Sequence, residues 1–167
     1  MEKPVAIVGY MGCGKTTIGG AIASTLGCEF VDLDRAIAKA AGSAISEIFR
    51  ASGEEHFRNL EHRALLGALD GTPERVVACG GGIILRQENR KLLGRAATVF
   101  LEEEVNTLYG RTRGGDRPLR ANSLEAFERR YAERLPLYEE VADLKVEVRG
   151  RPPTEVAEEI ARWLLHA

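Results

Sequence analysis

Long hydrophobic runs are absent from this sequence. A helix that spans a membrane needs about 20 consecutive apolar residues, whereas the apolar stretches of this 167-residue chain are only a few residues long. The amino-terminal stretch MEKPVAIVGY enters a short apolar run and then glycines, which does not fit a secretory signal peptide. We therefore expect a cytoplasmic protein that does not bind a membrane.

Cysteine is scarce, and neither sign of charge is in excess. The three cysteines, Cys13, Cys28 and Cys79, are widely spaced and form no CxxC pair and no Cys/His cluster. This spacing argues against a disulfide scaffold and against a zinc site. With 23 Lys and Arg against 25 Asp and Glu, the formal net charge is −2. The chain therefore lacks the overall positive field with which proteins bind nucleic acid non-specifically.

The sequence does contain a regular alternation of short apolar runs and helix-period segments. Its length fits one domain, which we place over residues 1–167. Because parallel neighbouring strands need crossover helices, the alternation predicts an α/β fold with a mainly parallel sheet, whose ligands bind at the carboxyl ends of the strands. The expected strands are 4–8, 29–31, 75–79, 97–101 and 144–148. The expected helices are 15–26 and 154–165, together with helix patterns over 33–69 that are broken at Gly42 and Gly53 and include the helices 35–41 and 54–69.

A phosphate-binding loop is the strongest motif. Residues 9–16 read GYMGCGKT, which matches GxxxxGK[ST], and they stand between a β-branched strand pattern and a helix pattern. Glycines let successive backbone N–H groups point inward as an anion nest, to which the helix adds its positive amino-terminal end. Lys15 then reaches the β- and γ-phosphates of a nucleoside triphosphate, and Thr16 ligates Mg²⁺. In the loop 9–17, the residues expected to hold the nucleotide are Gly12, Cys13, Gly14, Lys15, Thr16 and Thr17.

Two carboxylates follow the second expected strand. If strand geometry continues through Asp32-Leu33-Asp34, both carboxylates point the same way and Leu33 points to the other face. That placement suits a water-linked Mg²⁺ role and a substrate-hydroxyl role beside the phosphate loop. The alternative is that Asp34 caps the amino terminus of the helix 35–41. The residues alone favour neither interpretation.

Charged side chains on the expected helix 54–69 give a weaker signal. Arg58 and Glu61 lie three residues apart and therefore share a face. From the residues alone, a solvated surface ion pair is the favoured interpretation. His56 and His62 share no metal-ligand geometry and are expected at the surface.

Two glycine-containing segments are candidate ligand sites. Gly80, Gly81 and Gly82 follow the third strand, and glycines there let a ligand approach the backbone closely. Residues 110–122 read GRTRGGDRPLRAN, with four arginines and almost nothing apolar. A loop of that length in so small a domain is typical of a functional segment. We expect it to be a mobile lid that faces phosphates.

The order of the motifs resembles that of the shikimate kinase family, over essentially the whole chain. The resemblance implies the three-layer P-loop kinase fold, with a five-stranded parallel sheet of order 2-3-1-4-5, substrate-binding helices over about 33–61 and a lid. It also implies a monomer that transfers the γ-phosphoryl group of ATP, with one Mg²⁺, to the 3-hydroxyl of shikimate, on the route to chorismate and the aromatic amino acids. The motifs are GYMGCGKT, DLD (32–34), GSAISEIFRASGEEHFRNLE (42–61), CGGG (79–82), DRPL (116–119) and RLPLYEEVAD (134–143).

The resemblance also assigns roles to individual residues. Asp34 would bind the shikimate hydroxyls, Arg58 and Arg134 its carboxylate, and the Gly80–Gly82 backbone would line the pocket. At the nucleotide, Asp32 would hold Mg²⁺ through water, Arg117 would reach the phosphates, and Arg111 and Arg151 would flank the adenine. The catalytic residues implied are Lys15, Asp34 and Arg117. The lid residues Arg113 and Arg120 receive no role, and Arg149 is an alternative to Arg151.

Two other functions are compatible with a phosphate loop in a chain of this size. One is a different small kinase of the same architecture, such as a gluconate or nucleotide kinase, because gluconate also carries a carboxylate and hydroxyls. The other is a P-loop binding or regulatory module without turnover. The second is disfavoured because every expected catalytic position is filled.

Overall fold

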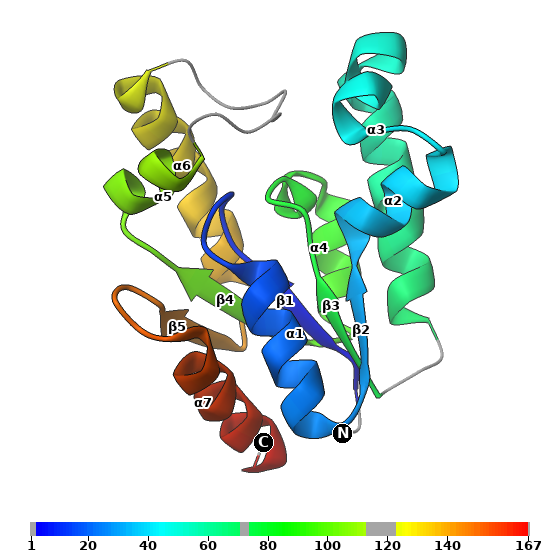
Figure 1. Ribbon diagram of the computed structural model, residues 1–167. Helices are drawn as coiled ribbons and strands as arrows, with labels where there is room; N and C mark the ends of the chain where they lie inside the picture. The colour runs from blue at the N-terminus through cyan, green and yellow to red at the C-terminus, as the bar shows by residue number, and fades with distance from the viewer. Residues whose placement is uncertain (1–2, 71–73, 113–122, 167) are drawn as a thin grey trace.

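Five strands form a single sheet in the computed structural model, which describes residues 3–70, 74–112 and 123–166. All the strand pairs described are parallel, and the strand order is β2-β3-β1-β4-β5 (Figure 1). This topology confirms the predicted sheet of order 2-3-1-4-5. The strands are β1 (Val5–Val8), β2 (Glu29–Asp32), β3 (Arg75–Ala78), β4 (Ala97–Glu102) and β5 (Leu144–Glu147).

The central strand β1 has the composition expected in a parallel sheet. Its four residues, Val-Ala-Ile-Val, are all fully buried, as expected of a strand covered on both faces. Val5 pairs with Val76 on one side and with Ala97 on the other. All five expected strands agree with the observed ones to within one residue at each end.

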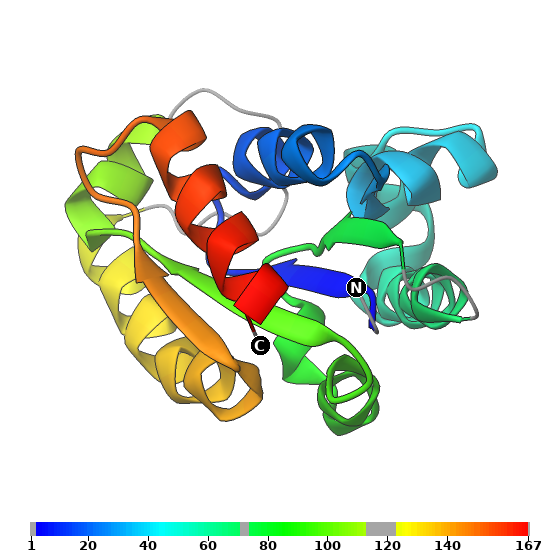
Figure 2. The ribbon, with the colours of Figure 1, turned by 90° about the horizontal axis from the view of Figure 1, so that it is seen from below.

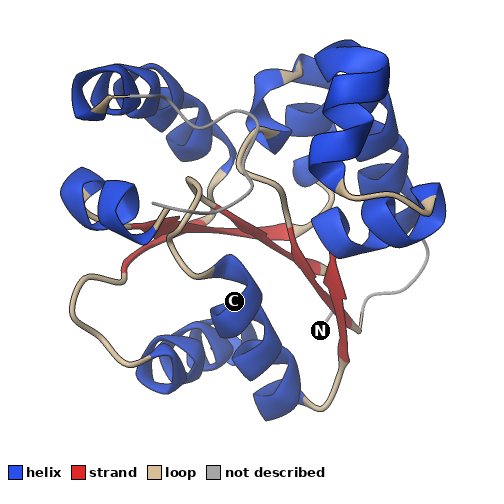
Figure 3. Cartoon of the chain, turned by 45° about the horizontal axis from the view of Figure 1, so that its top comes forward, coloured by secondary structure: helices blue, strands red, loops and turns tan. Residues whose placement is uncertain are grey.

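Helices cover both faces of the sheet (Figure 3). Helices α1 and α7 lie side by side on one face, α4 and α6 cover the other, and α2 and α3 stand beyond the β2 edge (Figure 2). The helices are α1 (Lys15–Leu26), α2 (Leu33–Ala41), α3 (Ile45–Leu69), α4 (Gln87–Leu93), α5 (Val105–Arg111), α6 (Leu124–Val141) and α7 (Pro153–His166), with a 3₁₀ turn η1 (Ile83–Leu85). Within the described ranges, no helix has both the length and the apolar character needed to cross a bilayer.

The predicted breaks at two glycines are confirmed. Gly42 ends α2 with φ of 63°, and Gly53 interrupts α3 with φ of 78°, both in the left-handed region that glycine tolerates. Because all strands run the same way, the segments that follow β1, β2 and β3 meet at the carboxyl end of the sheet. The chain changes direction at the two glycine breaks, and α2 and α3 lie on the β2 side of that end.

Candidate active site

A cavity of about 590 Å³ opens at the carboxyl ends of the strands. It is bordered by the loops after β1, β2 and β3 and by side chains from α3, α5 and α6. Among the described residues, Cys13, Thr17 and Arg151 are predicted site residues that do not line it. The predicted site residues that do are Gly12, Gly14, Lys15, Thr16, Asp32, Asp34, Arg58, Gly80, Gly81, Gly82, Arg111 and Arg134.

The phosphate loop wraps around the amino terminus of α1. Gly12 and Gly14 have φ of 88° and 97°, conformations that other residues rarely adopt, so glycine is required at both positions. Lys15 donates hydrogen bonds to the carbonyl oxygens of Gly9, at 2.8 Å, and Tyr10, at 3.0 Å. Its ammonium group is therefore held against the loop that the sequence predicts to bind phosphates.

Two of the three cysteines, one in this loop and one after β3, are buried and do not act as nucleophiles. Cys13 belongs to the loop, and its side chain is buried. Cys79 follows β3, and burial raises the pKa of its thiol far above the usual range. A buried neutral thiol is a packing group and not a reactive one.

Thr16 and Asp32 form the candidate magnesium site. The Thr16 hydroxyl donates to Asp32 Oδ2 at 2.6 Å. A hydroxyl and a carboxylate oxygen at the rim of a phosphate cradle suit Mg²⁺, which takes few protein ligands and completes its shell with water and substrate phosphates. The residues present therefore fit the metal that the motif predicts.

The structure corrects the strand geometry expected at Asp34 and the alternative that Asp34 caps a helix. Strand geometry ends at Asp32, and Asp32 itself is the N-cap of α2, because its Oδ1 accepts from the Arg35 backbone N–H at 3.1 Å. Asp34 lies in the first turn of α2 and does not cap it. Both carboxylates nevertheless line the cavity while Leu33 is buried, because the chain turns from strand to helix between them.

Arg58 and Glu61 form a buried ion pair and not the solvated pair that the spacing favoured. Arg58 Nη1 lies 2.8 Å from Glu61 Oε2, and the Glu61 side chain is 1% exposed. Arg58 Nη2 also contacts Glu54 Oε1 at 3.1 Å. Burial raises the pKa of the Glu61 carboxyl, and the Arg58 guanidinium partly offsets that rise. A helix face that looks solvent-exposed in sequence is covered here by the glycine segment.

The Gly80–Gly82 segment presses against this cluster. A Cβ at Gly80 would lie 2.8 Å from Glu61 Oε1 and 3.0 Å from Asp34 Oδ1, and a Cβ at Gly82 would lie 2.4 Å from Arg58 Nη1. Neither glycine is required for a left-handed conformation, since neither has positive φ. A side chain at either position would displace the charged ends of Asp34, Arg58 or Glu61 from where they now lie.

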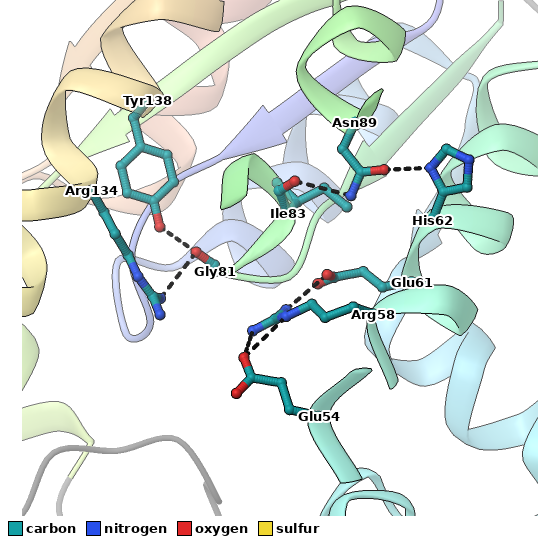
Figure 4. A network of polar contacts seen from close by, with 9 residues as sticks. All are labelled: Glu54, Arg58, Glu61, His62, Gly81, Ile83, Asn89, Arg134 and Tyr138. Carbon is teal, nitrogen blue, oxygen red and sulfur yellow. Dashed lines mark hydrogen bonds and ion pairs between the residues drawn. The ribbon is translucent and has the colours of Figure 1, made fainter. Parts of the chain in front are cut away.

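Helix α6 closes the cavity on the opposite side. Arg134 is 8% exposed, lines the cavity, and lies with its Nη1 3.5 Å from the Gly81 carbonyl oxygen (Figure 4). Its guanidinium also stands over the Tyr10 ring, 5.4 Å from the centroid. Two arginines, Arg58 from α3 and Arg134 from α6, therefore border one cavity that also contains the phosphate loop.

Comparison with known proteins agrees with this geometry. The sequence model of the shikimate kinase family matches residues 11–165. The chain belongs to the shikimate kinase family. A shikimate kinase from Thermodesulfovibrio yellowstonii is 38% identical over 164 residues, which cover 96% of this chain and 94% of that protein.

Solved shikimate kinases share the fold. One from Acinetobacter baumannii, in complex with shikimate, has a TM-score of 0.91 at 35% identity and covers 98% of this chain and 93% of its own. Another, from Aquifex aeolicus, has a TM-score of 0.86 at 31% identity and covers 97% and 96%. The predicted family, P-loop kinase fold and phosphotransferase class are confirmed, and with them ATP and Mg²⁺ as the family's co-substrate and metal.

In this kinase, Arg111 is tied to the phosphate loop. Its side chain is half-exposed, its Nη1 lies 3.1 Å from Oε2 of the fully buried Glu103 carboxylate, and the same Nη1 donates to the Gly12 carbonyl at 3.3 Å. Arg151 instead pairs with Glu155 and Glu159 of α7. Arg151 is not one of the described residues that line the cavity.

Arg149, the alternative to Arg151, lies 3.2 Å from Glu104 in an ion pair. The predicted lid residues Arg113, Arg117 and Arg120 lie outside the described residues, as does most of the segment 110–122.

Several polar residues near the site were missed by sequence reasoning. Asn89 is fully buried, donates to the Ile83 carbonyl at 3.0 Å, and contacts His62 Nδ1 at 2.7 Å (Figure 4). His62 is therefore partly buried and bonded, contrary to the surface position expected, whereas His56 is exposed as predicted. Glu103 and Tyr138 were also missed, although Tyr138 follows Arg134 by four residues, the spacing of neighbours on a helix.

Proposed function

We propose that this chain transfers the γ-phosphoryl group of ATP to the 3-hydroxyl of shikimate. One observation carries the proposal. A single cavity combines a phosphate loop containing Lys15 with two arginines, Arg58 and Arg134, that stand outside that loop and near an acidic residue, Asp34. Such a cavity suits a phosphoryl donor at one end and a hydroxy acid at the other.

At the nucleotide end, the loop backbone and Lys15 bind the β- and γ-phosphates. Thr16 and Asp32 are the residues that would hold Mg²⁺, which would neutralise phosphate charge. Arg111 flanks the nucleotide from α5, where Glu103 holds it beside Gly12. Arg117 is proposed to reach the phosphates and lies outside the described residues. Arg151 is proposed to flank the adenine, and in the structure it pairs with Glu155 and Glu159 of α7.

At the substrate end, Arg58 and Arg134 bind the carboxylate of shikimate, and Asp34 binds its hydroxyls. Phosphoryl transfer depends mainly on positioning and on charge stabilisation, because its transition state is loose and needs little covalent assistance from the protein. Asp34 accordingly orients the attacking hydroxyl and accepts its proton as the bond to phosphorus forms. The Gly80–Gly82 backbone lines the wall between the two ends.

A coupled assay for ADP release tests the proposal. The protein, with ATP and Mg²⁺, is given shikimate, gluconate or a nucleoside monophosphate in parallel. ADP release that depends on shikimate, with the product carrying phosphate on the 3-oxygen by NMR, is the expected result. Release that depends on gluconate or a nucleotide would assign another kinase activity. No release with any acceptor, while ATP still binds, would indicate a binding module without turnover.

Arg58→Lys is expected to raise the KM for shikimate about tenfold or more while changing the KM for ATP less than twofold. Lysine keeps the positive charge but lacks the planar fork that binds a carboxylate through two hydrogen bonds. Steady-state kinetics with each substrate varied in turn measures the split, and Arg63→Lys on the exposed face of α3 is the matched control. Equal changes in both KM values would show that Arg58 does not bind the carboxylate.

Glu103→Gln is expected to change the KM for ATP and not the KM for shikimate, which is the opposite of the result expected for Arg58→Lys. Glu103 is the buried anion that holds Arg111 beside the phosphate loop. Its loss leaves the half-exposed Arg111 side chain free to swing away from Gly12. The KM for ATP should rise about fivefold, since a charge-assisted contact is weakened, and the KM for shikimate should not change. A rise confined to shikimate would contradict a nucleotide-side role for this pair.

A further inference from the structure

Tyr138 makes a hydrogen bond that the chemistry described so far does not use. Its hydroxyl donates to the carbonyl oxygen of Gly81 at 2.5 Å (Figure 4). The side chain is fully buried on α6, and its ring is stacked on Phe100 of β4, with centroids 5.1 Å apart and planes 11° from parallel. Tyr138 does not border the cavity, whereas Gly81 does. One donor to the Gly81 carbonyl therefore comes from a side chain outside the cavity lining.

The orientation of that carbonyl matters because the peptide groups of a glycine segment turn easily. Glycine adopts a wide range of backbone conformations, and three glycines in a row give the 80–82 backbone little intrinsic preference. In a trans peptide the C=O of Gly81 and the N–H of Gly82 point in opposite directions, and the described residues contain no cis bond. Fixing the carbonyl toward Tyr138 therefore also fixes the direction of the Gly82 N–H.

A second donor reaches the same carbonyl, but from a residue that has another task. Arg134 Nη1 lies 3.5 Å from the Gly81 oxygen, at the limit of a hydrogen bond, and Arg134 is proposed to bind the substrate carboxylate. Tyr138 lies one helical turn further along α6 and holds the oxygen at much shorter range. Burial raises the pKa of the Tyr138 hydroxyl well above its usual range, so it stays protonated and acts as a donor at any physiological pH.

We propose that Tyr138 is a positioning residue that locks the Gly81–Gly82 peptide so that its carbonyl faces away from the anionic substrate. If this peptide turned over, its carbonyl dipole would point at the bound carboxylate and repel it, and the N–H would be lost to it. The lock also leaves Arg134 free to bind that carboxylate. This inference rests on the proposed binding of an acidic acceptor in the same cavity.

Tyr138→Phe tests the inference, because phenylalanine keeps the ring stacked on Phe100 and removes only the hydroxyl. The matched control is Tyr131→Phe, two turns earlier on α6, whose hydroxyl makes no hydrogen bond among the described residues and whose ring contacts Tyr10 at 5.4 Å. Tyr138→Phe is expected to raise the KM for shikimate about tenfold, the scale of one lost hydrogen bond together with a misplaced dipole. The KM for ATP should stay within twofold, and Tyr131→Phe should change neither.

A neutral acceptor and a non-kinetic measurement separate positioning from general loosening. Shikimate methyl ester carries no negative charge, so its KM should rise less than twofold on Tyr138→Phe. Amide hydrogen exchange of the variant should be faster over residues 79–85 and unchanged over α1 and α7. Equal rises for acid and ester, or exchange that is faster throughout the protein, would overturn the inference in favour of a purely structural role.

Two further outcomes separate a failure of the proposed function from a failure of this inference. If wild-type protein shows no shikimate-dependent ADP release, the proposed function fails, whatever Tyr138 does. If wild type is active and Tyr138→Phe leaves the shikimate KM unchanged, the inference fails alone. Should Tyr138→Phe not fold, p-aminophenylalanine at position 138 keeps the ring and a weaker donor. A smaller selective rise in the shikimate KM is then expected, and an unchanged KM overturns the inference.

Discussion

Lys15→Ala is expected to lower kcat at least ~10²-fold. Lys15 Nζ lies within hydrogen-bond distance of two carbonyls of the phosphate loop, so its charge is already positioned where the transferring phosphoryl group is proposed to lie. A preorganised positive group of this kind stabilises charge that develops in the transition state, and removal of one such group typically costs 10²- to 10³-fold in kcat. Single-turnover phosphoryl transfer at saturating ATP and shikimate measures the effect directly.

Lys91→Ala on the exposed surface of α4 is the control for the Lys15 experiment. It removes the same side chain at a site remote from the cavity lining, and its kcat should equal that of wild type. Near-normal turnover in a folded Lys15→Ala protein would remove the phosphate loop from the mechanism proposed above. A melting curve for each variant shows whether the protein is folded.

Asp34→Asn is expected to reduce turnover ~10²- to 10⁴-fold with little change in melting temperature. The structure sharpens this prediction, because the N-cap of α2 is Asp32 and not Asp34. Asparagine at 34 keeps the size of the side chain and loses the negative charge that is proposed to orient the acceptor hydroxyl and take its proton. ATP affinity should not change, since the proposed nucleotide contacts come from other residues.

Glu88→Gln is the matched control for Asp34→Asn. Both acidic residues lie in the first turn of a helix, where a negative charge interacts favourably with the helix dipole by less than about 1 kcal/mol. Glu88 is exposed on α4 and outside the cavity lining, so its neutralisation measures the dipole effect alone. Full activity of Asp34→Asn with an unchanged melting temperature would mean that Asp34 does not bind the acceptor.

Local patterns in the sequence predicted those parts of the fold and site that local chemistry determines. The phosphate loop was predictable because glycine positions and Lys15 are fixed by backbone geometry within eight residues. The buried strands were predictable because parallel strands covered on both faces are continuously apolar. The breaks at Gly42 and Gly53 were predictable for the same local reason, since left-handed backbone conformations favour glycine.

Features that depend on distant segments were not predictable in this way. The burial of Arg58 and Glu61 results from contact with Gly80 and Gly82, some twenty residues away in sequence. Helix α6 went unassigned because its sequence is strongly polar and contains Pro136, which ordinarily interrupts a helix. Without that helix, the four-residue spacing of Arg134 and Tyr138 carried no structural meaning.

The junction between β2 and α2 fixes the spacing between the Asp32 and Asp34 carboxylates. Asp32 bonds Thr16 of the phosphate loop and caps α2, and Asp34 lies two residues further on in the same helix. One inserted residue between them would rotate Asp34 by about 100° around the helix axis. Insertions are therefore intolerable here, even where surface loops of the same protein would accept them. If the proposed roles of Asp32 and Asp34 hold, the β2–α2 side sets the distance between the proposed metal site and the acceptor hydroxyl, so a kinase re-engineered for a larger acceptor must gain its space on the α6 side of the cavity.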